Sequence, residues 1–121
     1  MPHSRDPAFL SDMLTAARGI LRSLQGRSLA DYQRDEDFRL VTERRLEIIG
    51  EAARRLSDEL RALHPGIPWR RVIGLRNVLA HQYDEVDDVE VWRLVNENLP
   101  RLVEWLESVL PSPPPDPEPE P

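Results

Sequence analysis

The sequence predicts an all-α protein, an antiparallel bundle of four to five helices. Three observations favour this fold class. Apolar residues recur at three- and four-residue intervals along most of the chain, which is the spacing of one helix face. No segment alternates apolar and polar residues as a half-buried strand does, and no Asn-Gly or Asp-Gly pair marks a hairpin. Short polar connections separate the long amphipathic segments, as in antiparallel bundles.

The first helix is expected from Asp6 to about Leu24. Asp6 followed by Pro7 is typical of a helix start, with Asp as the N-cap and Pro at the first helical position. Gly26 can end this helix, and a short helical turn capped by Ser28 follows. The apolar face of the first helix consists of Phe9, Leu10, Met13, Leu14, Ala17, Leu21 and Leu24.

Three further helices complete the predicted bundle. The second runs over about 37–60 and ends at the loop LHPGIP, where Pro and Gly punctuate the chain. The third begins near Pro68. The fourth follows a capping-rich break at 84–88, and Pro100 must kink or interrupt it. The predicted apolar faces are Phe38, Val41, Ile48, Ile49, Ala52 and Leu56 in the second helix, and Val89, Trp92, Val95, Leu99, Leu102, Val103 and Leu106 in the fourth.

One domain is predicted, over residues 6–110. The chain has 121 residues, and about 110 are enough for a single core. Residues 111–121 read PSPPPDPEPEP, with seven prolines and no large apolar side chain. We therefore expect a disordered or polyproline-like tail. A linker is the simpler interpretation of this tail, and a docking segment is the alternative.

Composition narrows the classes of function. The net charge is −6, whereas nonspecific nucleic-acid binders are usually basic, so any contact with RNA or DNA must use a local patch. Every basic side chain is Arg, which suits phosphate binding, but a GC-rich genome is the simpler explanation. There is no Cys, which excludes disulfides and Cys-ligated metals. Without a signal peptide or an apolar run of about 20 residues, the protein is expected in the cytoplasm and not at a membrane.

The third helix carries an unusual set of polar groups in the stretch RNVLAHQYDEV at 76–86. On a wheel of about 100° per residue, Asn77 and His81 share a face nearly opposite the core. Arg76 and Tyr83 lie in line with one another on the flank. These polar groups therefore face solvent, a cleft or a partner. The residues expected to point to the core are Val72, Leu75, Val78 and Leu79.

Arg76 and His81 are five positions apart, so a straight helix splays them by roughly 140°. They can meet at one phosphate if the helix unwinds after Ala80, or if a second subunit supplies the matching group across a two-fold axis. By spacing alone, an ordinary surface Arg and His is the simpler interpretation. We expect no metal, because His3, His64 and His81 lack ligand spacing. No Gly-rich phosphate loop points to a cofactor either.

The stretch RNVLAHQY, together with IPWRRVIGL before it, VW…LP after it and EIIGEAARRLS upstream, resembles the HepT-like branch of the HEPN superfamily over residues 8–108. The resemblance implies a homodimeric ribonuclease toxin of a type VII-like toxin–antitoxin pair. The antitoxin would be a minimal nucleotidyltransferase that transfers AMP to the toxin. Carried over by position, Arg76 and His81 are the catalytic pair, Asn77 is the polar residue between them, and Tyr83 is the AMP acceptor.

These residue types can cleave RNA without a metal, because RNA supplies its own 2′-OH nucleophile. His81 could move the proton, and Arg76 could hold the phosphate. Glu47 and Glu51 share a face of the second helix, and either could orient Arg76. Local pairs with neighbouring arginines are the simpler role for both carboxylates, and Trp69 and Trp92 are best explained as core or interface anchors. The alternatives to the enzyme are a non-catalytic dimer that binds RNA or a nucleotidyltransferase, and a purely structural dimer.

Overall fold

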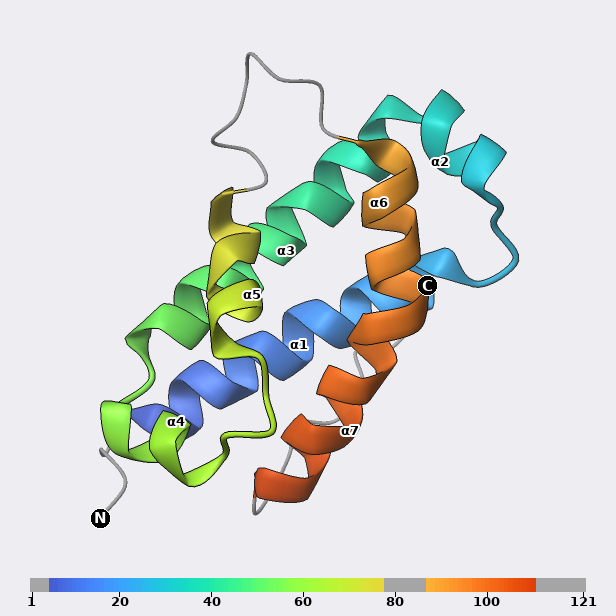
Figure 1. The fold of residues 1–121 in the computed structure, drawn as a ribbon. Coiled ribbons are helices and arrows are strands. Elements are labelled where there is room, and N and C mark those ends of the chain that lie inside the picture. The colour runs from blue at the N-terminus through green and yellow to red at the C-terminus, as the bar shows by residue number, and fades with distance from the viewer. Residues whose placement is uncertain (1–4, 78–86, 111–121) are drawn as a thin grey trace.

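The two longest helices of the computed structural model, α1 and α3, run in opposite directions against one another at the centre of an all-α bundle (Figure 1). The structure describes residues 5–77 and 87–110, and no strand occurs within them, which confirms the predicted fold class. The helices in chain order are α1 (Asp6–Leu24), α2 (Leu29–Arg34), α3 (Glu36–Arg55), α4 (Asp58–Leu63), α5 (Trp69–Gly74), the 3-10 turn η1 (Leu75–Asn77), α6 (Asp88–Arg93), the π-helical turn η2 (Leu94–Asn98) and α7 (Leu99–Val109).

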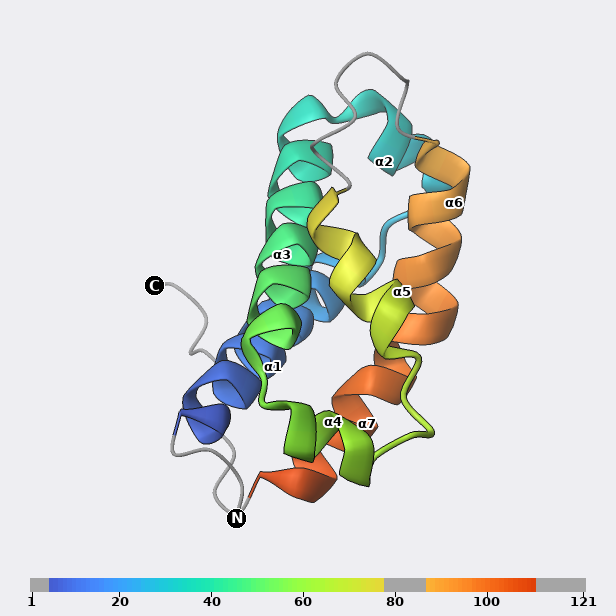
Figure 2. The same ribbon diagram turned by 60° about the vertical axis from the view of Figure 1, so that its left-hand side comes forward.

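Helix α3 packs against α1, α2, α5 and η1. Helix α1 packs along it, α2 lies near its beginning, and α5 with η1 lies along its later turns, while α7 covers α1 (Figure 2). The core therefore lies between α1, α3 and the helical run from α6 to α7. Its most deeply buried apolar side chains are Met13, Leu14, Ala17, Ile20, Leu46, Ile49, Ala53, Val95, Leu99 and Leu106.

The connection from α1 to α2 follows the predicted turn chemistry. Helix α1 ends at Leu24, and Gly26 has a φ of +73°, the left-handed conformation that glycine adopts without strain. Ser28 caps α2: its hydroxyl accepts from the backbone N of Asp31, whose carboxylate accepts in return from the backbone N of Ser28. This reciprocal arrangement is a capping box.

The prediction that Asp6 is the N-cap of the first helix is wrong. Arg5 occupies the cap position without a side-chain cap bond, and Asp6 is already helical. Its carboxylate is buried and accepts from the backbone N of Ser57 at 2.8 Å and from the Ser57 hydroxyl at 2.6 Å. Asp6 thus joins the start of α1 to the start of α4, because a buried carboxylate needs strong donors.

The predicted helix over 37–60 is two helices. Helix α3 ends at Arg55, Leu56 is extended, and Ser57 starts α4 by accepting from the backbone N of Leu60. The Ser57 hydroxyl thus has two roles, because it donates to Asp6 and accepts from the backbone N of Leu60. The sequence does not reveal this break, because Leu56 is buried and continues the apolar pattern of the helix through it.

The apolar face predicted for the second helix is also wrong at one position. Val41 is 46% exposed, and Thr42 takes the buried place. The Thr42 hydroxyl donates to the carbonyl O of Phe38 at 2.8 Å, which satisfies it inside the core. The buried row of α3 thus runs through Phe38, Thr42, Leu46, Ile49 and Ala53.

The later helices begin where the sequence predicts, but both change their winding. Helix α5 follows Pro68 and tightens at Leu75 into η1. Ahead of Pro100 the fourth helix widens into η2, where the backbone N of Leu99 donates to the carbonyl O of Leu94. The wider turn is an adjustment to Pro100, which has no N–H to donate to the carbonyl of Asn96.

Both tryptophans predicted as anchors are half-buried against the core. The Trp69 indole N–H donates to the carbonyls of Arg61 and His64, and its ring lies edge-on to Trp105. The ring of Trp92 contacts Tyr32. None of the helices in the described ranges is long and apolar enough to cross a membrane. The predictions for the proline-rich tail fall outside these ranges.

Candidate active site

Two of the four motif residues predicted to form the site lie among the described residues. Arg76 and Asn77 form the end of η1, and both are exposed. His81 and Tyr83 lie outside the described residues, as do Val78 and Leu79. Val72 and Leu75, the described half of the predicted core-facing set, are buried as expected. The site is therefore described from Arg76 and the α3 surface beneath it.

Gly50 explains how Arg76 comes to lie on α3. A Cβ atom at Gly50 would collide with the backbone N of Arg76 and lie 2.9 Å from the carbonyl O of Ile73. The lack of a side chain thus lets the backbone of η1 approach that of α3 directly. Because the contact is backbone to backbone, it fixes the position of the Arg76 backbone on α3.

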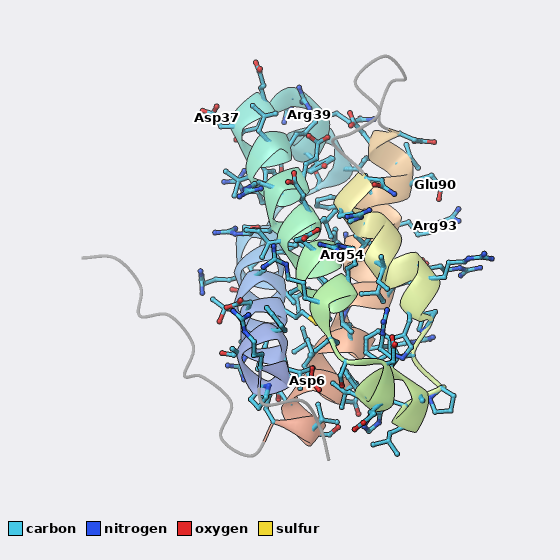
Figure 3. All side chains as sticks on the ribbon, turned by 90° about the vertical axis from the view of Figure 1, so that its left-hand side faces the viewer. Asp6, Asp37, Arg39, Arg54, Glu90 and Arg93 are labelled. Carbon is cyan, nitrogen blue, oxygen red and sulfur yellow. The ribbon has the colours of Figure 1, made fainter. Side chains whose placement is uncertain are left out.

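Glu51, the next residue, holds the side chain of Arg76. The Arg76 Nη1 lies 3.3 Å from the Glu51 Oε2. Arg54 grips the same carboxylate with Nη2 at 2.7 Å from Oε1 and Nε at 3.3 Å from Oε2, and the Arg55 Nε lies 3.2 Å from Oε1. Figure 3 shows Arg54 on the part of α3 beside α5. Glu51 therefore makes the local pairs with Arg54 and Arg55 and also bonds to Arg76.

The electrostatics of Glu51 follow from these bonds. Hydrogen bonds from Arg54, and then from Arg55 and Arg76, lower the pKa of Glu51 to about 2 against the opposing effect of desolvation. The carboxylate is thus ionised at any physiological pH. Glu47, the other candidate to orient Arg76, pairs instead with Arg44, whose Nη1 lies 2.8 Å from the Glu47 Oε1.

The guanidinium of Arg76 keeps donors for a ligand. Its side chain is 40% exposed, and within the described residues Glu51 takes one bond from a group that carries five N–H donors. A guanidinium that is held by one hydrogen bond and has other N–H donors exposed can bind a phosphate oxygen. The 3-10 winding turns the chain by about 120° per residue, so Asn77 points away from Arg76 more sharply than an α-helical wheel predicts.

Sequence reasoning found one part of this site and missed another. The spacing of GEAARR places Glu51 within reach of Arg54 and Arg55, and the sequence offers both Glu47 and Glu51 as partners of Arg76 without deciding between them. The sequence also offers no periodic signal for Gly50, because a glycine in a helix is read as a weak point unless a close neighbour is known. Both features depend on how η1 packs on α3.

Comparison with known proteins gives a consistent result. The family model described as "Ribonuclease HepT-like" matches residues 13–109. The chain is 33% identical over 102 residues to the protein named "Putative RNase MJ1380" of Methanocaldococcus jannaschii, covering 84% of this chain and 94% of that protein.

A second relative is the "Probable ribonuclease HepT" of Thermococcus cleftensis, which is 34% identical over 94 residues, or 78% of this chain and 86% of that protein. No solved structure matches the chain significantly. The family match covers most of the chain, including the α3 turns and the motif RNVLAHQY from which the candidate site is built. The chain therefore belongs to the HepT-like ribonuclease family.

Proposed function

We propose that the protein is a metal-independent endoribonuclease and the toxin of a type VII-like toxin–antitoxin pair. Membership of the HepT-like ribonuclease family supports the ribonuclease activity. The observation that carries the residue assignment is the placement of Arg76: Gly50 seats its backbone on α3, and Glu51 holds one corner of its exposed guanidinium.

In the proposed reaction the substrate 2′-oxygen attacks the adjacent phosphorus, and the bond from phosphorus to the 5′-oxygen breaks. His81 moves the proton that leaves the 2′-OH or the one that the departing 5′-oxygen needs, because imidazole titrates near neutral pH. Arg76 binds the non-bridging oxygens and stabilises the charge that gathers on them. Asn77 supports the site by orienting the imidazole or binding the RNA backbone.

The protein acts as a homodimer in this proposal. Arg76 and His81 are too far apart around an ideal helix to meet at one phosphate, and a two-fold axis would bring two copies of each into one groove. Scattering or sedimentation at micromolar concentration should give the mass of two chains. A monomeric mass in a preparation that cleaves RNA would contradict the shared groove.

The test of the enzyme is cleavage of a labelled RNA in the presence of EDTA. We expect His81→Ala and Arg76→Ala each to slow cleavage by about 10²–10⁴-fold, while Arg44→Ala, another exposed arginine in a one-to-one ion pair, retains the activity. If the wild type binds RNA but does not cleave it, the protein is a binding module. If either variant is as active as the wild type, that catalytic role is wrong.

The proposed regulation is AMP transfer to Tyr83 by a partner nucleotidyltransferase. AMP would add bulk and negative charge next to the phosphate-binding arginine and repel the substrate. Tyr83→Phe keeps the ring and removes the acceptor oxygen. We expect this variant to stay toxic in cells and to escape neutralisation by the co-expressed antitoxin, with no added AMP mass. If Tyr83→Phe is inactive without the antitoxin, the hydroxyl has a catalytic role instead.

A further inference from the structure

The single negative charge of Glu51 lies among three positively charged arginines. Arg54, Arg55 and Arg76 all bond to it, which leaves a surplus of two positive charges at one place in a chain of net charge −6. Other pairs in the described part of the chain, such as Arg44–Glu47 and Arg27–Asp35, join one guanidinium to one carboxylate.

The three guanidiniums are also accessible. The side chains of Arg54, Arg55 and Arg76 are 46%, 55% and 40% exposed. They come from two elements, the last turn of α3 and the end of η1. They adjoin because each of them bonds to at least one oxygen of the Glu51 carboxylate. Their other N–H donors therefore lie next to one another on a single patch of surface.

A purely structural role explains only part of this arrangement. Arginines in the last turn of a helix interact favourably with its dipole, and pairs three or four residues apart stabilise a helix slightly. These effects account for Arg54 and Arg55 on α3. They do not account for the third cation, which η1 brings to the same carboxylate although that carboxylate already has two partners.

We propose that Arg54 and Arg55 bind a phosphate of the RNA strand next to the phosphate held by Arg76, so that the last turn of α3 is a backbone-binding subsite of the active site. The inference rests on the proposed ribonuclease function. An RNA strand presents a phosphate at every nucleotide, and planar guanidiniums bind phosphate oxygens in pairs of hydrogen bonds. Such contacts position the strand without reading its sequence.

The test measures binding apart from cleavage. A fluorescent single-stranded RNA with 2′-O-methyl groups throughout has no 2′-OH nucleophile, so its anisotropy reports affinity alone on the full chain. The variant is Arg54→Gln/Arg55→Gln. The matched control is Arg44→Gln/Arg93→Gln, which loses the same charge from two one-to-one pairs. Circular dichroism verifies that both variants fold, and the unmethylated RNA reports cleavage in parallel.

We expect the dissociation constant of Arg54→Gln/Arg55→Gln to rise about tenfold at low salt, with the control near wild type. The slope of log affinity against log salt should fall by about 0.7 for each phosphate of a single strand that the variant no longer binds. Arg54→Lys/Arg55→Lys keeps the charge and should recover most of that slope.

The outcomes separate this inference from the proposed activity. If the Gln variant binds the methylated RNA as tightly as its control, or if the wild type does not bind it, the subsite is wrong even where cleavage is confirmed. If the wild type binds through Arg54 and Arg55 but never cleaves unmodified RNA, the subsite stands and the proposed ribonuclease function is overturned.

Discussion

Two carboxylates of α3, one in each half of the helix, have pKa values shifted in opposite directions. In its first half, Glu43 is buried and lies close enough to Tyr32, one ring of an aromatic cluster, to act on its phenol. Burial raises the pKa of the Glu43 carboxyl, and the negative charge of Asp88 adds to the effect. Near its end, Glu51 is partly exposed and bonded to three arginines, which lower its pKa to about 2. The environment of Glu43 therefore disfavours its charged form, and the environment of Glu51 stabilises it.

The first half of α3, which we call the aromatic half, packs in a cluster of aromatic rings. The ring centroids of Tyr32 and Phe38 lie 5.3 Å apart, those of Tyr32 and Trp92 lie 5.6 Å apart, and the Arg27 guanidinium covers Phe38 at 4.4 Å. Burial also raises the pKa of the Tyr32 phenol. The difference teaches that one helix can hold one carboxylate where burial penalises its charge and another where arginines and solvent stabilise it. Core residues such as Leu46 and Ile49 lie between the two carboxylates.

Among substitutions in α3 itself, Gly50→Ala should have the largest effect, because it disrupts the close contact between α3 and the backbone of Arg76. The added methyl group collides with the η1 backbone, so Arg76 must move away from Glu51. We expect RNA cleavage to fall by about 10²-fold, the order that a displacement of about 1 Å can cause. The free energy of unfolding should fall by about 1–3 kcal/mol, as overpacking typically does.

Gly74→Ala is the matched control for this substitution, since a Cβ there meets nothing within 4 Å. It should leave cleavage unchanged and raise stability slightly, because Ala is the better helix former. Cleavage rates and denaturant unfolding curves measure both variants. Equal losses in the two would show that the close contact at Gly50 has no special role.

Glu51→Gln should act on the rate of cleavage more than on binding. The neutral amide holds Arg76 less firmly, so we expect kcat to fall about tenfold through poorer positioning. Removing a negative charge from an RNA site should leave KM unchanged or lower it. Glu47→Gln, on the same helix face but paired with Arg44, is the control. An increase in KM with unchanged kcat would argue against positioning through Glu51.

The pH dependence of stability should distinguish the two carboxylates. For Glu51 the folded pKa of about 2 is below the ordinary value of about 4.3, so its stabilisation is complete above that value and lost as pH falls toward about 2. Glu51→Gln should therefore destabilise the protein at pH 6 and converge with the wild type in acid.

The sign is reversed for Glu43. Its folded pKa is raised, so the folded protein binds the proton more tightly than the unfolded chain. Stability then falls as pH rises from the ordinary value through the raised one. Glu43→Gln should gain stability relative to the wild type over that interval, measured by urea midpoints at several pH values. Parallel profiles for the two Gln variants would contradict the contrast between the halves of α3.

Tyr32→Phe should have the smallest effect. The phenol is buried, and its hydroxyl has no hydrogen-bond partner among the described residues. Removing an unsatisfied buried hydroxyl keeps the ring contacts, so the free energy of unfolding should rise by about 1 kcal/mol. Cleavage should not change, because the aromatic half is remote from Arg76 along α3. A clear loss of stability would show that the hydroxyl is satisfied in solution.

The sequence by itself predicts the features that depend on local contacts. The all-α class, the limits of α1, the Ser28 cap, the start of α5 after Pro68 and the interruption near Pro100 all follow from residues within a few positions of one another. Helix periodicity and capping act over one or two turns, so a linear pattern contains them.

Only the tertiary structure decides the rest. Asp6 leaves the expected cap for Ser57, which lies 51 positions away, and that contact accompanies the division of the predicted second helix. Arg76 reaches Glu51 across 25 positions, through an approach that Gly50 permits. Such contacts depend on which backbones can come together in three dimensions. A missing Cβ atom, or a carboxylate buried among donors from distant residues, leaves no periodic pattern along the chain. For this physical reason the sequence alone does not reveal them.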